Sequence, residues 1–222
     1  MRDLQPKAHY TPCAGHSFNL AITNSCSVPP VRNCIDQIKN LTGWIKHSPK
    51  REGLLKAVYQ KGVQAGTNQS RNPILNVCIT HWVENIAGRE RFCLSHPFLI
   101  HMCEVIVYGD SEFELHHDNW TAEDKRNAMV HLKALENFEF LYALVTLQRC
   151  LMYLREAAEK LLGESQDILC GVTLLKECSL NLKEMRENID EYSKRIFEQS
   201  SNLVTKSGIS ITQPRISRRQ QH

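Results

Sequence analysis

The sequence has few residues that interrupt helices and lacks the marks of a membrane or secreted protein. Ten Gly and eight Pro in 222 residues leave room for long helices. No apolar run approaches the roughly 20 residues of a membrane-spanning helix, and the start, MRDLQPKAHY, has no apolar stretch of the secretory type. The nine cysteines include no CxxC pair, so a disulfide scaffold is not expected. These absences predict a nuclear or cytoplasmic protein that is neither secreted nor bound to a membrane.

Motifs for common enzyme chemistry are lacking as well. The sequence holds no Gly-rich phosphate loop and no GxSxG. Its acidic residues concentrate between 104 and 198, in helical patterns and an acidic connection, whereas a two-metal site needs acids that are held rigidly. Hydrophobic residues at 42% and charged residues at 23% are ordinary for one globular domain, or for a core with an appendage. We therefore expect no enzyme, no cofactor and no small-molecule substrate.

Charge is divided unevenly along the chain. Residues 1–80 carry a net charge of +7, residues 81–205 carry −8, and residues 206–222 carry +4. Such asymmetry is typical of a surface for nucleic acid or for an acidic partner at the basic ends. It fits equally well a fold in which the basic front and the acidic middle attract each other. Both interpretations stay open on charge alone.

Apolar residues recur at helical spacing, which predicts a mainly α architecture. Residues 8–25 read as a strand or a short helix. A pair of prolines suits the first turn of a helix over 29–45, whose apolar residues lie on one face. Another short helix covers 54–59, and 62–73 form a loop by composition.

The second half of the chain has the strongest helical signal. Pro97 is expected to separate two helices, because proline lacks the N–H that a helix interior uses. Thr121, with Asp124 three residues later, resembles a helix N-cap. The apolar run 128–162 is long for a globular helix and predicts an element of a bundle. Residues 168–197 repeat the same pattern.

Two groups of cysteine and histidine have partial metal-ligand spacing. Cys13 and His16 form a CxxH, but a structural zinc needs four ligands, and no second close pair follows. In the other group, residues 93–103, the first Cys and His would share a helix face, whereas the second His and Cys would point in different directions. We expect a buried hydrogen-bonded pair in the first group and a core Cys103 with exposed histidines in the second. No metal is predicted.

A basic helix and loop cover residues 39–61. Lysine and arginine at helical spacings can track phosphates, with an affinity that falls as salt rises. The alternative is an ordinary solvated helix face, and both interpretations stay open. The residues concerned are Lys39, Lys46, His47, Lys50, Arg51, Lys56 and Lys61.

Five short motifs follow one another along the chain. CAGHSFNL begins at Cys13, SPKR ends at Arg51, CITHW ends at Trp82, a helical run over 136–169 ends in QDIL, and PRISRRQQH comes last. In order and spacing they resemble transposases of the hAT superfamily, in particular the zinc-finger MYM-type and THAP-type relatives. These carry C-x-x-H-x-L-N-L, S-x-x-R, C-x-T-R-W, L-Q-x-x-x-x-D-I and P-R-x-x-x-R-Q stretches. The first motif has Phe here where the family usually has Leu.

The resemblance implies a catalytically inactive derivative. The family cleaves and joins DNA with two Asp and one Glu that hold divalent metal, and the match places those acids outside this chain. Asp3, the one acid before the CxxH, lies closer to it than the family's second Asp does. His81 stands where the family has Arg, so a phosphate contact would be weaker, while Trp82 could still stack on an extruded base. The alternative for Trp82 is a core aromatic, which the missing arginine favours.

The sequence therefore predicts a mainly α protein, with a truncated piece of an RNase H-like α/β core at 1–30, a helical insertion domain at 31–205 and a basic flexible tail at 206–222. We interpret it as an inactive fragment or domesticated derivative of a hAT-type DNA transposase that binds nucleic acid in the nucleus. The alternative is a helical protein-interaction module without a DNA role, since a truncated domain exposes faces that were once covered. The candidate nucleic-acid-binding residues are Trp82, His81, Lys46, Lys50, Arg51, Arg215, Arg218 and Arg219, and Cys13 and His16 form a structural motif.

Overall fold

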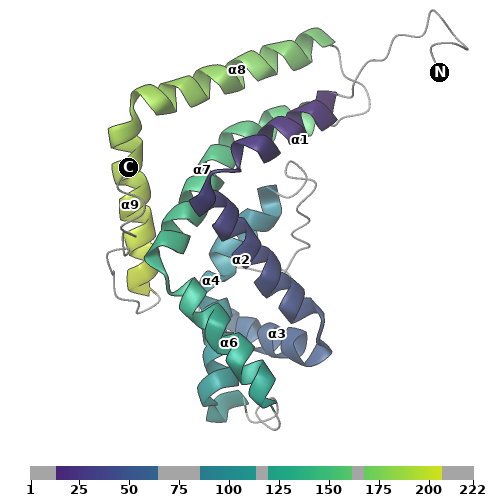
Figure 1. The fold of residues 1–222 in the computed structure, drawn as a ribbon, viewed down its shortest axis with the longest axis vertical. Helices are drawn as coiled ribbons and strands as arrows, with labels where there is room; N and C mark the ends of the chain where they lie inside the picture. Colours follow the sequence, from purple (N-terminus) through teal and green to yellow (C-terminus); the bar gives the residue numbers. More distant parts are fainter. Residues whose placement is uncertain (1–13, 65–85, 114–119, 162–167, 207–222) are drawn as a thin grey trace, which may run out of the picture.

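The computed structural model describes residues 14–64, 86–113, 120–161 and 168–206, and these are almost entirely helical (Figure 1). This confirms the mainly α prediction. The described residues contain no strand, so the RNase H-like α/β piece is not seen, and residues 14–25 take the helical alternative. The helices are α1 (Ala14–Ser25), α2 (Pro29–Lys46), α3 (Pro49–Gln64), α4 (Ile86–Tyr108), the short 3-10 helix η1 (Ser111–Phe113), α6 (Ala122–Leu135), α7 (Phe138–Leu161), α8 (Ile168–Glu187) and α9 (Ile189–Lys206).

Local sequence explains the ends of several helices. Pro29 occupies the first position of α2, where a missing N–H costs nothing. Gly109 follows α4 with φ of 83°, a conformation that glycine adopts without a side-chain clash, and its N–H bonds to the Val105 carbonyl. Thr121 caps α6, because its Oγ1 accepts a 3.0 Å hydrogen bond from the Asp124 N–H. The predicted N-cap is confirmed.

Pro97 does not separate two helices, which corrects the prediction. Helix α4 runs without a break from Ile86 to Tyr108 and contains Pro97 in its interior. A proline inside a helix costs about 3 kcal/mol or more. The residues on both sides of Pro97 are buried in the core, Phe92 before it and Leu99 and Ile100 after it. The burial of these side chains offsets the cost, because both halves of the helix pack into the same hydrophobic cluster.

The two long apolar runs each contain a break. The run 128–162 divides between α6 and α7, where the Asn137 side chain accepts a 2.8 Å hydrogen bond from the Glu139 N–H and its carbonyl accepts from the Leu141 N–H. The run 168–197 divides at Asn188, between α8 and α9. The apolar spacing continues across both breaks because the helices on either side bury residues against shared neighbours. The hydrophobic spacing alone therefore predicted one helix where the structure has two, because local polar groups end the first helix and begin the second.

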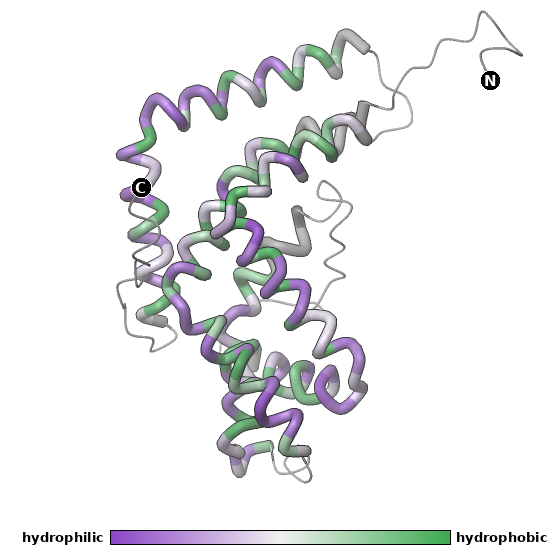
Figure 2. The backbone as a smooth tube through the Cα atoms, viewed as in Figure 1, coloured by the Kyte–Doolittle hydropathy of each residue, from purple (hydrophilic) through white to green (hydrophobic). Residues whose placement is uncertain are grey.

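The buried side chains form two clusters. The large cluster joins α2, α3, α4 and α6 with the first turns of α7 and includes Ile38, Leu54, Met102 and Leu141. The small cluster joins α1, the start of α2, the later part of α7 and α8, through Ile22, Ile35, Leu147, Leu151, Leu154, Leu174 and Cys178. Figure 2 shows hydrophobic and hydrophilic positions alternating along the helices of both clusters. Helix α7 belongs to both.

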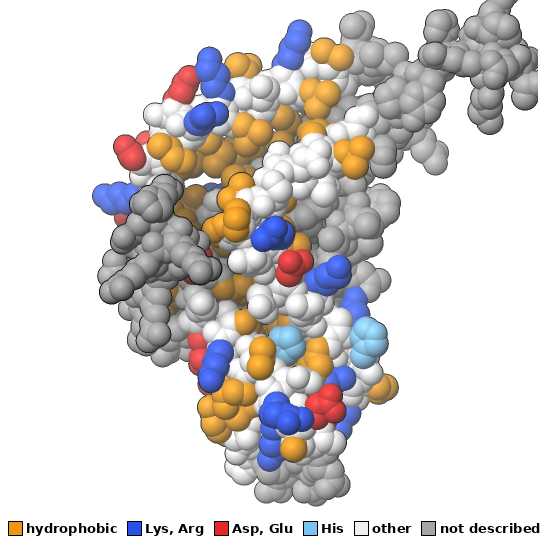
Figure 3. Space-filling view, in the orientation of Figure 1, with side chains coloured by type: hydrophobic (Ala, Val, Ile, Leu, Met, Phe, Trp, Pro, Cys, Tyr) orange, Lys and Arg blue, Asp and Glu red, His pale blue; other side chains and the backbone are white. Residues whose placement is uncertain are grey.

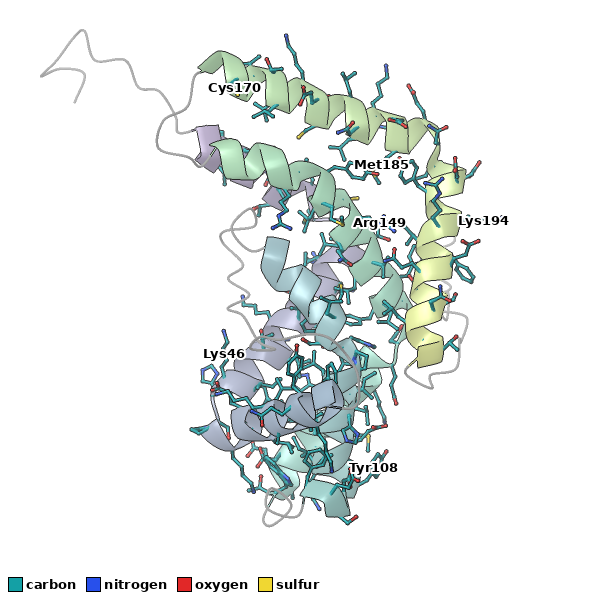
Figure 4. All side chains as sticks on the ribbon, turned by 180° about the vertical axis from the view of Figure 1, so that it is seen from behind. Lys46, Tyr108, Arg149, Cys170, Met185 and Lys194 are labelled. Atoms are coloured by element: carbon teal, nitrogen blue, oxygen red, sulfur yellow. The ribbon has the colours of Figure 1, made fainter. Side chains whose placement is uncertain are left out.

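Helices α8 and α9 form an outer arm, by which we mean residues 168–206. Figure 1 shows α8 lying beside the later part of α7, and α9 turning at Asn188 to return along its earlier part. Polar contacts tie the arm to α7. Tyr142 Oη lies 2.9 Å from Ser193 Oγ, and Arg149 Nε donates a 3.0 Å hydrogen bond to Gln199 Oε1. Figure 4 shows Arg149 in this position between α7 and α9.

Candidate interaction surfaces

Arg51 is held inside the fold. Its guanidinium carbon lies 4.5 Å from the centre of the Trp44 ring, and Nη1 lies 3.2 Å from Asp124 Oδ1. The side chain is only 12% exposed, against 24% for Asp124. Trp44 in turn packs on His131, with ring centres 5.0 Å apart. Arg51 therefore joins the start of α3 to the first turn of α6. Its guanidinium, which was predicted to contact a phosphate, is bound to groups of the protein itself.

The neighbouring basic side chains also have partners in the chain. Lys50 Nζ lies 4.0 Å above the centre of the Trp120 ring, a cation–π contact with a buried indole. Lys61 pairs with Glu112 and lies 4.8 Å from the Phe113 ring centre. The Lys61 and Arg51 pairs link the basic front to the acidic middle. They favour the attraction of the two halves within one fold over a free basic surface.

A separate set of cations lies along α2. Arg32, Lys39 and Lys46 are exposed and spaced seven residues apart, so they share one face of the helix. Figure 4 shows Lys46 at the end of α2. It lies in the last turn, where a cation stabilises the helix dipole. On the face drawn in Figure 3, Lys and Arg side chains stand as separate groups, not as one continuous basic patch.

Several predicted site residues lie outside the described part of the chain. These are Cys13, His81, Trp82, Arg215, Arg218 and Arg219. His16 lies within α1, but its side chain is not among those described. The structure therefore brings together only Lys50 and Arg51 from the predicted set, at the start of α3, with Lys46 on the preceding helix.

His96 is the buried polar residue that sequence reasoning missed, because both histidines of 93–103 were predicted to be exposed. Its side chain is fully buried, and Nε2–H donates a 3.0 Å hydrogen bond to the Leu135 carbonyl at the end of α6. Burial lowers the pKa of His96, although the Leu135 bond acts in the opposite direction. His101 is partly exposed, and Cys103 is buried as predicted, with a thiol pKa raised to about 12 by burial.

Neither a metal cluster nor a membrane span is found in the described ranges. No group of three or more His, Cys, Asp or Glu side chains there is placed to hold a metal ion. His96 bonds to a carbonyl oxygen instead. Among the same residues, no helix combines the length and the apolar composition that crossing a membrane requires.

The arm exposes large apolar side chains. On α8, Leu180 is 65% exposed, and Val172, Leu175 and Leu182 are also exposed. Leu174, Cys178 and Met185 of the same helix are buried. We call Val172, Leu175 and Leu182 the outer stripe of α8, because their spacing of three and seven residues places them on one face. Figure 3 shows hydrophobic side chains gathered along α8 on the edge nearer the body.

A groove lies between the start of α7 and the first half of α9. Its volume is about 540 Å³, and its lining residues are Phe138, Glu139, Tyr142, Asp190, Ser193, Lys194 and Phe197. The rings of Phe138 and Phe197 meet edge to face, with centres 5.4 Å apart. Phe197 is nevertheless 48% exposed, whereas Phe138 is buried. The groove thus offers an aromatic floor with charged groups beside it.

Comparison of the chain with protein-family models, with curated proteins and with solved structures finds no match.

Proposed function

We propose that this protein is a non-catalytic helical interaction module that binds a protein partner through the outer stripe of α8. The observation that carries this proposal is the exposure of Val172, Leu175 and Leu182 on a stripe of α8 directly beside the packed residues Leu174 and Cys178. Large apolar side chains exposed along one helix face are characteristic of interaction sites. The arm also holds six basic and six acidic residues, a neutral balance that suits a protein partner better than a polyanion.

The expected partner is an amphipathic helix. Apolar residues at spacings of three and four, or of seven, form the seam of a helix pair. The outer stripe follows this spacing, with the polar Ser179 at the position between Leu175 and Leu182. A polar residue in such a seam fixes the alignment of two helices at some cost in stability.

The test compares partner capture by matched variants. Leu175→Lys with Leu182→Lys places two charges in the outer stripe, and Leu94→Lys places one on α4 at a leucine of similar exposure. Proteins captured from nuclear and cytoplasmic extracts are quantified for each variant. The proposal predicts at least one protein that the double variant loses and the Leu94 variant keeps. Identical captured sets for both variants would refute it.

A second candidate function is nucleic-acid binding by an inactive hAT-derived protein. The resemblance of the motifs supports it, together with the exposed row of Arg32, Lys39 and Lys46 on α2. On this proposal residues 1–30 descend from an RNase H-like core, 31–205 from its helical insertion, and the protein acts in the nucleus. Arg51 and Lys50 would serve the fold.

Fluorescence anisotropy with hairpin DNA over a salt series separates the contributions of the α2 cations, the tail and Trp82 to binding. Replacing the three α2 cations by Gln should weaken binding. It should also make the affinity less dependent on salt, by the equivalent of up to about three phosphate contacts. A chain ending at Thr205 reports the basic tail, and Trp82→Ala reports base stacking. Binding lost only with the tail would indicate generic phosphate attraction. Micromolar protein without salt-sensitive binding would exclude this second function.

A further inference from the structure

The groove between α7 and α9 has the features of a binding site for an extended apolar segment with a basic residue. Phe138, Tyr142 and Phe197 supply aromatic surface, and Phe197 leaves about half of its side chain in solvent. Glu139 and Asp190 contribute two carboxylates to the lining, against the single cation Lys194. Figure 4 shows Lys194 on the outer side of α9. This combination favours a ligand with apolar side chains and positive charge.

The chain itself carries such a segment directly after α9. Residues 207–222, SGISITQPRISRRQQH, contain Ile209 and Ile211 two residues apart, which places both on the same side of an extended chain. Arg215 follows four residues later, and Arg218 and Arg219 after it. The segment contains no Asp or Glu, so its charge is opposite to that of the two carboxylates in the groove.

The length of the extended tail matches the distances from the end of α9 back to the groove residues. Phe197 lies nine residues before the end of α9, which is about 14 Å along a helix, and Asp190 lies sixteen residues before it, or about 24 Å. An extended chain that turns back after Lys206 covers about 3.3 Å per residue. After about one residue for the turn, it reaches the level of Phe197 at Ile211 and the level of Asp190 close to Arg215.

We propose that residues 207–222 fold back along α9 and place Ile211 in the groove against Phe197, with Ile209 just before the groove on the last turns of α9 and Arg215 beside Asp190 and Glu139. The groove is separate from the outer stripe of α8, so this inference does not depend on the proposed function. Its consequence is that the α7–α9 face is covered by the chain's own end, while the outer stripe stays available.

Trypsin cleavage of the full chain tests the proposal, because a docked segment cannot enter a protease active site. The bond after Arg215 is followed by mass spectrometry at low protease concentration. We expect cleavage in the wild type to be at least fivefold slower than in Phe197→Asp and in Ile209→Ser with Ile211→Ser. Asp190→Lys should also accelerate cleavage. Leu180→Asp, which adds the same charge at an exposed apolar position outside the groove, should leave the rate at the wild-type value.

Further controls keep the result decisive. Synthetic peptides of 207–222 with and without the two serines give the intrinsic cleavage rates, which are used to normalise the rates in the protein. The tail variant changes no residue of a described helix, so it decides the question if Phe197→Asp fails to fold by circular dichroism. Equal normalised rates in the wild type and the tail variant would overturn the proposal. Protection that grows with protein concentration would also overturn it, since the groove would then hold a neighbour's tail.

Discussion

His96 shows how a single buried residue can join two helices and respond to pH. It lies in the middle of α4, and its Nε2–H bonds to the last carbonyl of α6, at Leu135. Its Nδ1 is buried and has no hydrogen-bond partner in the described structure. A proton on Nδ1 would therefore be a donor without an acceptor, in a site where burial already penalises the charged ring. His131, buried near Arg51, has a pKa that burial and the arginine both lower.

Stability should fall as the pH falls below about 6.5. The unfolded chain binds a proton on each histidine near pH 6.5, whereas the folded chain binds it only at lower pH because both pKa values are lowered. Above pH 6.5 both histidines are neutral in the folded and unfolded chains, and the fold keeps its full stability. Below pH 6.5 the unfolded chain binds the protons first, so each histidine lowers the unfolding free energy by up to about 1.4 kcal/mol per pH unit. Urea unfolding between pH 7.5 and 5 measures the slope. His96→Gln keeps a donor for Leu135 and should reduce the slope, and an unchanged slope would contradict this role.

Arg51 should be a stability residue. Removing its charge with Arg51→Met breaks the Asp124 pair and the Trp44 contact in a site that is mostly shielded from water. We expect a loss of about 1–3 kcal/mol in the unfolding free energy, between the values for exposed and for fully buried ion pairs. Lys56→Met is the matched control, because Lys56 forms an exposed pair with Glu52 one helical turn away, and it should change stability little. Equal effects of the two substitutions would refute the assignment.

At the scale of elements, the packing of α3 on α4 depends on a close approach. A Cβ atom at Gly62 of α3 would overlap the ring of Phe98 on α4. That ring packs edge to face on Tyr59, with centres 5.0 Å apart, so it cannot move without disturbing a second contact. In α2, by contrast, a Cβ at Gly43 would meet no atom within 4 Å.

The two glycines should therefore respond to alanine with opposite signs. Gly62→Ala forces Phe98 or the helix pair to shift and should lower the unfolding free energy by about 1–3 kcal/mol. Gly43→Ala removes backbone freedom from the unfolded chain and should raise it by about 0.5–1 kcal/mol. Thermal and urea unfolding of both variants provide the measurement. A neutral Gly62→Ala would mean that α3 and α4 are less closely packed than described.

The helices differ in how well the sequence predicts their ends. Helix α2 and the cap of α6 could be predicted because their signals are local, a proline pair and a threonine followed by Asp124. The break at Asn137 could not, because its signal is one side chain inside a continuous apolar pattern. Helix α4 continues through Pro97 because tertiary burial outweighs a local preference, and no local pattern reports that burial.

The candidate surfaces were less predictable than the helices for the same reason. The basic residues of 39–61 could be found by composition, but Arg51 and Lys61 meet carboxylates 73 and 51 residues away. Only the folded chain decides which cations stay exposed. Likewise, the sequence shows only that the apolar residues of α8 recur at helical spacing. Contact with α7 decides which of them are packed and which form the outer stripe.

At the scale of the whole molecule, burial is unevenly distributed. Helices α2, α3, α4 and α6 surround the large cluster, whereas among the described side chains of α8, residues 170–187, only a few large ones are buried, Leu174, Cys178 and Met185. A helix with few buried contacts opens more readily than one in a core.

Hydrogen exchange should reveal this difference. Amides of 172–184 in α8 should exchange at least about tenfold faster than those of 99–106 in α4, because opening α8 exposes less apolar surface. Leu174→Ala should accelerate exchange in α8 and leave α4 unaffected. Mass spectrometry of peptides from the two helices measures both rates. Equal protection of the two segments would show that the arm and the large cluster open together.

Helix α7 joins the two clusters end to end, and this has a mechanical consequence. Ile22 of α1 and Leu174 of α8 pack in the same small cluster as Leu151 and Leu154 of α7. We therefore expect a displacement of α8 to be transmitted through the outer part of α7 to α1. A partner that pulls on α8 would therefore displace α1 as well, although the two helices lie near opposite ends of the sequence.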